Sequence, residues 1–146
     1  MNATFNQGWT TGGRTYDWID PSSRFASPQL REWQQRERDR WQVIVDLLLG
    51  WRSDPSPLLE EETPPPEIAV IDHALRVCEG WQRVGQSLPD RVLPDGAGGI
   101  AFEWYREPWF SDVEFESNGQ GTWRVYHDSR PVDRGQFRWK PQWVEL

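Results

Sequence analysis

The chain has 146 residues, enough for one domain of ordinary size, and its 16 basic and 23 acidic side chains give a formal net charge of −7. This acidic balance argues against non-specific binding to duplex nucleic acid, which requires a basic face that neutralises phosphates. A single cysteine excludes an internal disulfide and any multi-thiolate metal site within one chain. Because no apolar run approaches the roughly 18 residues of a membrane span and the N-terminus lacks a signal-peptide core, we expect a cytoplasmic protein without membrane contact.

Residues 1–28 are predicted to form an N-terminal arm, and residues 29–146 a single α+β domain. The arm is rich in Asn, Thr, Gly and Ser, and Ile19 is its one branched aliphatic residue. It also contains several aromatic residues, by which such a segment can dock onto the rest of the protein. These are Phe5, Trp9, Tyr16, Trp18 and Phe25.

A first helix is predicted over about residues 28–50. Ser27 followed by Pro28 is typical of a helix N-terminus, and Gly50 is a suitable C-terminal cap. The apolar stripe along this helix is weak in its first half and strong in its second half. We therefore expect the N-terminal turns to project from the body of the domain.

A second helix is predicted over about residues 66–84, ending at Gly85, with apolar residues over much of its circumference. The intervening residues 52–66 contain five prolines and an acidic block, which is typical of a stiff, extended linker. The two helices are thus expected to form a helical hairpin.

Between about residues 100 and 139 the pattern changes to the alternation that is typical of half-buried strands. Asn118 and Gly119 mark a turn, and a last short strand is expected at residues 136–139. We predict a three- to four-stranded antiparallel meander with the helical hairpin packed on its apolar face. The residues expected on that buried face are Ile100, Phe102, Trp104, Val113, Phe115, Trp123 and Val125.

The segment LPDRVLPDGAGGIAFEW, residues 88–104, resembles a widespread set of small bacterial proteins, as does the strand DVEFE before the Asn-Gly turn. These proteins share a Pro…Asp-Gly-Gly-aliphatic-x-aliphatic-Glu-Trp signature after a helical pair. The resemblance covers about residues 42–127 and departs from the signature at Ala97 and at an additional glycine. It implies the fold and no established activity. The paired genes typical of such proteins imply an antitoxin-like or defence-accessory role with a partner encoded by a neighbouring gene.

Strand alternation places four carboxylates together on the polar face of the predicted sheet: Glu103, Asp112, Glu114 and Glu116. Clustered carboxylates can bind a divalent cation, or act as an acid–base pair when their pKa values are driven apart. They can also form an acidic partner-binding face. The simplest expectation is a solvated face on which Arg106 and Arg124 pair with carboxylates across strands.

No pattern in the sequence is typical of catalysis or of a cofactor site. A GxSxG motif and a P-loop are absent, and the glycines at 96, 98 and 99 precede a strand rather than a helix. His73 and Cys78 are five residues apart, on rather different faces of the second helix, which does not suit metal ligation. We predict a protein that is not an enzyme and that has no catalytic, cofactor-binding or metal-binding residues.

Eleven tryptophans and an excess of arginine over lysine are the sharpest features of the composition. Trp and Arg dominate protein interfaces, so a non-catalytic protein-binding module is the first hypothesis. The alternative is a subunit that contacts single-stranded nucleic acid within a larger complex, because aromatic rings interleaved with arginines can stack on bases. Residues 38–52 and 134–140 have that composition.

Partner contacts are predicted from aromatic residues in segments without helical or strand periodicity. Trp109 and Phe110 stand out because they fall in a predicted loop, where small polar residues are usual. An exposed apolar surface of this kind usually marks an interaction site. The alternative is that arm and tail fold back and bury their rings against the helices. The predicted partner-binding residues are Trp109, Phe110, Trp139 and Trp143.

Overall fold

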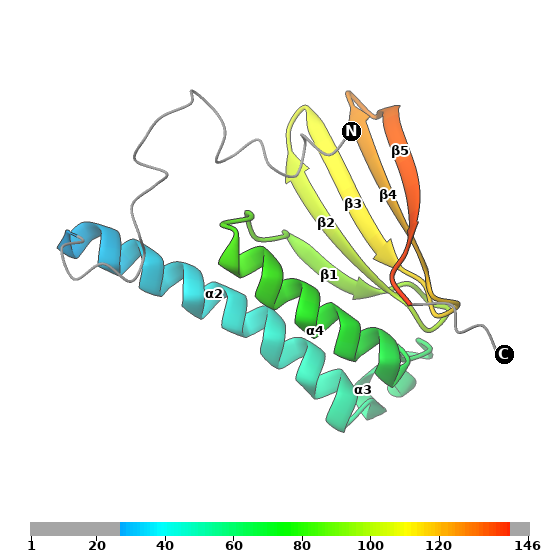
Figure 1. The fold of residues 1–146 in the computed structure, drawn as a ribbon. Helices are drawn as coiled ribbons and strands as arrows, with labels where there is room; N and C mark the ends of the chain where they lie inside the picture. Colours follow the sequence, from blue (N-terminus) through cyan, green and yellow to red (C-terminus); the bar gives the residue numbers. More distant parts are fainter. Residues whose placement is uncertain (1–26, 141–146) are drawn as a thin grey trace, which may run out of the picture.

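The computed structural model describes residues 27–140, in which a group of helices precedes an antiparallel sheet (Figure 1). This order confirms the predicted α+β class. None of the helices in this part of the chain has the length and apolar character that a membrane crossing needs. The elements are α2 (Pro28–Ser53), α3 (Ser56–Glu60), α4 (Ile68–Arg83), β1 (Arg91–Pro94), β2 (Ile100–Arg106), β3 (Trp109–Phe115), β4 (Gln120–His127) and β5 (Arg130–Arg138).

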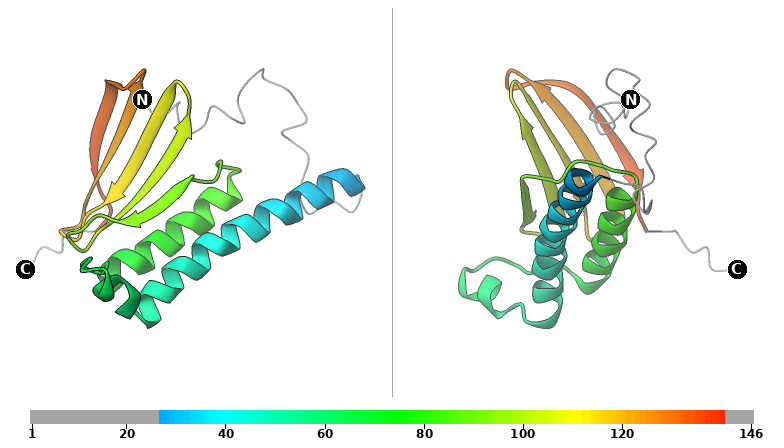
Figure 2. Two further views of the ribbon diagram at one scale, coloured as in Figure 1. Left: turned by 180° about the vertical axis from the view of Figure 1, so that it is seen from behind. Right: turned by 90° about the vertical axis from the view of Figure 1, so that its left-hand side faces the viewer.

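The helices α2 and α4 form the predicted hairpin. The Ser27 hydroxyl caps α2 by accepting a hydrogen bond from the Leu30 amide at 3.1 Å. Near the other end of α2, the Arg52 guanidinium pairs with the Asp72 carboxylate of α4 at 2.7 Å. The N-terminal half of α2 extends past the end of α4, as the weak apolar stripe predicted (Figures 1 and 2).

The linker was predicted to be extended throughout, and this is wrong for its first part. α2 continues to Ser53, and the short helix α3 follows at once. Pro57 lies in the first turn of α3, where the missing amide hydrogen costs nothing, and Leu58 is buried. Burial of Leu58 therefore folds a segment whose proline content suggested extension.

The sheet has five strands in sequential order, each antiparallel to the next, so the predicted three to four strands are one too few. The additional strand is β1, which pairs Val92 with Phe102. Pro94 is compatible with this position because β1 is an edge strand. β5 is also longer than the predicted segment 136–139, since Pro131 and Gly135 weakened its pattern.

Both helices lie on one face of the sheet, which we call the inward face (Figure 2). The predicted inward residues are confirmed: six of the seven are buried, and Trp123 is partly buried against the same core. Trp81 of α4 packs edge-on against Phe102 and Trp104, with ring centroids 5.1 and 5.4 Å away. Aromatic packing thus joins hairpin and sheet.

Two glycines allow aromatic rings to lie flat over β4 and β5. A side chain at Gly135 would collide with the indole of Trp123, and one at Gly121 would collide with the ring of Phe137. Trp123 and Phe137 are therefore held on the inward face, and alternation directs the residues on either side of Phe137 outward.

Candidate functional site

The outward face of the sheet, opposite the helices, carries the predicted carboxylates in a network of ion pairs. Arg124 of β4 binds both oxygens of Asp112 of β3, at 3.0 Å (Nε–Oδ1) and 2.8 Å (Nη2–Oδ2). This pair raises the pKa of Arg124, and the Asp112 side chain is only 8% exposed. The predicted cross-strand pairing of Arg124 is confirmed, and the bidentate geometry leaves Asp112 no free oxygen.

The other predicted cation, Arg106, does not pair across β2 and β3. Its guanidinium binds Asp90, 2.5 Å away in the segment before β1. Glu103 instead lies 3.6 Å from Arg91 of β1 and accepts a hydrogen bond from the Tyr105 hydroxyl. The partners of Arg106 and Glu103 at this edge therefore come from β1, a strand that was not predicted, and from the segment that precedes it.

Glu114 has the most perturbed carboxyl group on the outward face. Burial, with a hydrogen bond to Asp95 and repulsion from Asp95 and Glu116, raises its pKa to about 7, against the pull of Arg124. Oδ1 of Asp95 accepts hydrogen bonds from the amides of Ala97 and Gly99 in the β1–β2 turn. The charged form of Glu114 is therefore disfavoured near neutral pH.

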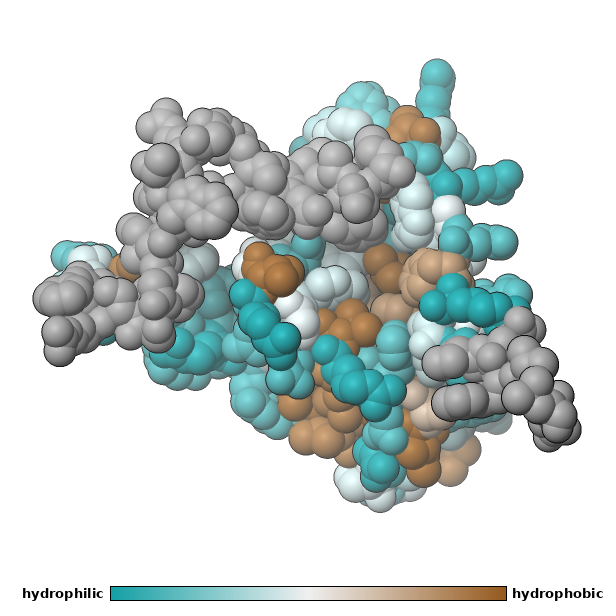
Figure 3. Space-filling model, viewed as in Figure 1, coloured by the Kyte–Doolittle hydropathy of each residue, from teal (hydrophilic) through white to brown (hydrophobic). Residues whose placement is uncertain are grey.

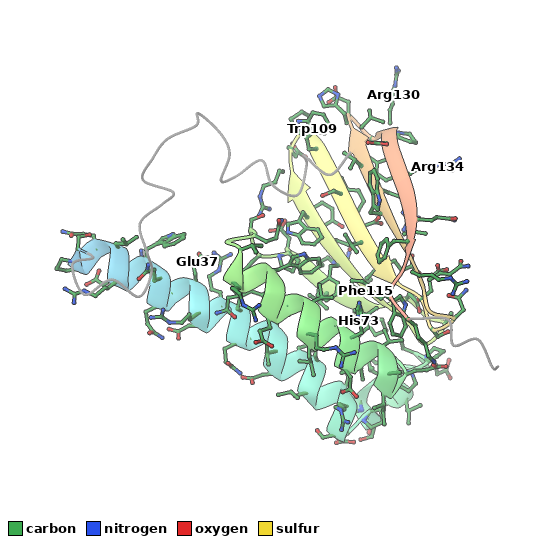
Figure 4. The ribbon with its side chains drawn as sticks, in the orientation of Figure 1. Glu37, His73, Trp109, Phe115, Arg130 and Arg134 are labelled. Carbon is green, nitrogen blue, oxygen red and sulfur yellow. The ribbon has the colours of Figure 1, made fainter. Side chains whose placement is uncertain are left out.

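Two reactive groups of α4, Cys78 and His73, are buried and partly buried. Burial raises the pKa of the Cys78 thiol to about 12, which makes it a poor nucleophile. Burial and Arg76 lower the pKa of His73, whose ring lies 4.9 Å from both Phe115 and Trp139 (Figure 4). Within residues 27–140, no three His, Cys, Asp or Glu side chains gather as a metal ion requires.

The end of the sheet beside the β2–β3 and β4–β5 turns carries aromatic residues on both faces, which we call the distal aromatic cluster. The ring centroid of Phe110 lies 4.9 Å from that of Tyr105 and 5.6 Å from that of Tyr126, across three strands. Trp109 lies on the other face of the same end, 4.5 Å from His127. The cluster comprises Tyr105, Trp109, Phe110 and Tyr126.

The distal aromatic cluster stands clear of both helices. Both turns beside it rise away from the hairpin, and Trp109 lies at their level (Figures 1 and 4). Tyr105 is 45% and Trp109 39% exposed. The sequence placed Trp109 and Phe110 in a loop, which is wrong: both are paired residues of β3, because Glu107 and Pro108 alone form the turn.

The other predicted partner-binding residues lie elsewhere. Trp139 is partly buried: its ring stacks on His73, and its Nε1 donates to the Glu116 carbonyl at 2.8 Å. This contact fits the alternative in which the tail packs against the helices. Trp143 lies outside the described residues, as do residues 1–26 of the predicted arm.

The residues that would stack on nucleic-acid bases are also engaged within the protein. Trp41 is buried under the hairpin, and Phe137 packs against Phe115 with ring centroids 5.8 Å apart. Arg40 and Arg52 form ion pairs with Glu37 and Asp72. Base stacking needs exposed rings, which these two segments do not offer among the described residues.

A second apolar surface covers part of the helical hairpin. Figure 3 shows apolar side chains gathered low on the molecule, around the C-terminal half of α2 and the start of α4. Single exposed aliphatic residues are normal, and these are spread over three elements. They are Val43, Leu47, Leu49, Leu59 and Ile68.

Comparison of the chain with protein-family models, with curated proteins and with solved structures finds no match.

Proposed function

We propose that the chain is a non-catalytic protein-binding module that contacts its partner through the distal aromatic cluster. The observation that carries this proposal is the row of three aromatic rings across β2, β3 and β4, on a sheet end that the helices do not cover. Tyr and Trp supply large contact areas at low entropic cost, which is why they are frequent in binding hot spots.

The state of the reactive groups supports binding rather than catalysis. Asp112 is held by Arg124, the Cys78 thiol is buried, and His73 packs between two aromatic rings. Glu114, whose pKa is raised, lies on an open sheet face beside other charged groups. A catalytic acid or base acts on a substrate held within hydrogen-bonding reach.

The proposed setting follows from the resemblance to small bacterial proteins. It is an antitoxin-like or defence-accessory subunit in the cytoplasm, with a protein partner encoded by a neighbouring gene. The distal aromatic cluster is the surface on which we place that partner. Contact with single-stranded nucleic acid is less well supported, because the rings of Trp41, Phe137 and Trp139 are packed internally.

The test is co-expression with the neighbouring gene product, followed by titration of the purified proteins. Trp109→Ala removes an exposed ring whose contact is His127, so we expect a nearly unchanged Tm and binding weakened by about 2 kcal/mol or more, roughly thirtyfold.

Trp33→Ala is the matched control, because Trp33 is an equally large ring that is 52% exposed on the remote half of α2. It should leave both Tm and affinity unchanged. A Trp109→Ala protein that loses stability while binding with full affinity would show that this ring belongs to the core. Failure of the wild-type protein to bind would contradict the proposed partner.

A further inference from the structure

The strand β5 forms an open edge of the sheet. Within the described residues it pairs with β4 and with no other strand (Figure 1). An open edge presents unpaired amide and carbonyl groups to which another extended chain can add. At one end of β5 this edge is interrupted, because Pro131 lacks an amide hydrogen and the β4–β5 register shifts between Val125 and Tyr126, which leaves Val132 of β5 unpaired in the ladder.

The ladder shows which backbone groups of β5 face the open edge. The Trp139 amide donates to the Gly119 carbonyl at 3.0 Å, which continues the β4–β5 ladder. Because bonded positions alternate along an antiparallel strand, residues 133, 135 and 137 face β4 and residues 134, 136 and 138 face outward. The Arg134 amide is capped by the Asp133 carboxylate at 2.9 Å, so among residues 27–140 the Gln136 and Arg138 amides are the edge-facing donors without a partner.

The side chains beside this edge are basic. Arg134 and Arg138 pair with Arg124 and Gln120 of β4, on the outward face, and Lys140 follows. All three are exposed and have no ion pair within residues 27–140. Figure 4 shows Arg134 pointing away from the sheet. In a chain of net charge −7, this is a local concentration of unpaired positive charge.

Charge complementarity argues against two occupants of the edge: a second copy of the chain, and the segments of this chain outside the described range. A second copy adding antiparallel about Gln136 would place Arg134 opposite Arg138 twice, and like charges directly opposite destabilise a sheet. The segments outside the described range, residues 1–26 and 141–146, contain three carboxylate side chains against two arginines. Neither segment has the alternating acidic residues that would complement the edge.

We propose that the β5 edge binds an extended acidic segment of a partner protein by strand addition. Its acidic side chains, spaced four residues apart, would lie beside Arg134 and Arg138. The partner side chains that point to the inward face of the sheet would lie beside Gly135 and the partly buried Phe137, where apolar residues fit. Single-stranded nucleic acid shares the negative charge, but the neighbouring rings face inward and offer no base a stacking surface.

The test uses a fluorescent synthetic peptide in which Glu and Val alternate, measured by anisotropy against the full chain. We expect it to bind, and a Lys–Val peptide to bind at least about tenfold more weakly. The double variant Arg134→Glu with Arg138→Glu should reverse this preference. Equal binding of the two peptides by the wild type, or no binding of the Glu–Val peptide at about 1 mM, would overturn the proposal.

Gln136 separates strand addition from simple charge attraction. Gln136→Pro removes an edge-facing amide that β4 does not use, whereas Gln136→Ala keeps that amide. We expect Pro to weaken peptide binding about tenfold or more and Ala to leave it unchanged. An N-methylated peptide makes the same test on unaltered protein. Full binding of either the Pro variant or the N-methylated peptide would contradict strand addition.

Two further measurements identify the surface and the ligand class. Trp109→Ala should leave peptide binding unchanged. A failure of the proposed partner site at the distal aromatic cluster can therefore be distinguished from a failure of the proposed peptide site at the β5 edge. An oligothymidine probe should bind more weakly than the Glu–Val peptide at the same salt concentration. Tighter oligothymidine binding would assign the basic edge to nucleic acid instead.

Discussion

At the scale of single residues, Arg124 organises the outward face. Its guanidinium binds Asp112 with two hydrogen bonds and also lies 3.5 Å from Glu114. These two hydrogen bonds and the ion pair offset the cost of burying the Asp112 carboxylate. Glu114 receives the weaker contact and faces Asp95 and Glu116, so its charged form is disfavoured.

Glu114 predicts a specific pH dependence of stability. Its pKa is about 7 in the folded protein and 4.5 as the ordinary value, so the unfolded chain ionises first as pH rises. The protonated Glu114 contributes its full stabilisation below pH 4.5, and this contribution is lost as the pH rises through 7. Glu114→Gln keeps a hydrogen-bond donor toward Asp95 at every pH. The Tm of the variant, relative to that of the wild type, should therefore increase as the pH rises from 4.5 to 7.

The control for this prediction is Glu60→Gln, which alters an exposed carboxylate at the end of α3. Its Tm difference from the wild type should stay constant over the same range, measured by circular dichroism at matched ionic strength. A Glu114→Gln difference that also stays constant would show that the pKa of Glu114 is not raised in the folded protein.

At the scale of elements, α2 consists of two halves with different support. The second half buries Trp41, Ile44 and Leu48 against α4 and the sheet. The first half projects and is held by its cap and by exposed side-chain contacts such as Arg40 with Glu37. Exposed pairs of this kind contribute a few tenths of a kcal/mol each, so the first half opens more easily than the rest.

Ser27→Ala tests this division of α2. Loss of the cap costs about 1 kcal/mol, which corresponds to about fivefold faster amide exchange in the first turns. The global Tm should be nearly unchanged, because the projecting half contributes little to the core. Ser53→Ala, at the other end of α2, should leave exchange in the first turns as it is. A large fall in Tm for Ser27→Ala would show that the first half is packed.

At the scale of the whole molecule, the hairpin and the sheet share one core. Phe102 of β2 is fully buried and lies edge-on to both Trp81 of α4 and Phe115 of β3. The same arrangement leaves the outward face and the β5 edge without helical cover. One-sided packing therefore accounts for both the stability of the domain and the surfaces on which we place partners.

Phe102→Ala should destabilise the entire domain by about 3–5 kcal/mol, since it opens a cavity between hairpin and sheet. Urea unfolding followed by far-ultraviolet circular dichroism and by tryptophan fluorescence should show coincident transitions at a lower midpoint. Phe110→Ala, on the outward face, is the control and should cost much less. An unchanged midpoint for Phe102→Ala would contradict the register of β2.

Local periodicity was sufficient to predict both long helices, the projecting turns of α2 and the inward residues from Ile100 to Val125. It succeeds there because the spacing of apolar residues indicates which side of a helix or strand is buried. It failed for α3 and β1, which are short and flanked by proline. Leu58 and Val92 belong to these elements because of contacts that are distant in sequence.

The tertiary structure alone decided the candidate sites. Arg124 and Trp139 have similar local sequence surroundings, yet one binds Asp112 on the outward face and the other packs on His73. Trp109 became an exposed strand residue, Phe110 a half-buried one and Arg134 an edge residue only through strand order and register. Composition showed that the chain is rich in Trp and Arg. Which of them face a partner depends on pairings across the sheet, and these are not encoded in local spacing.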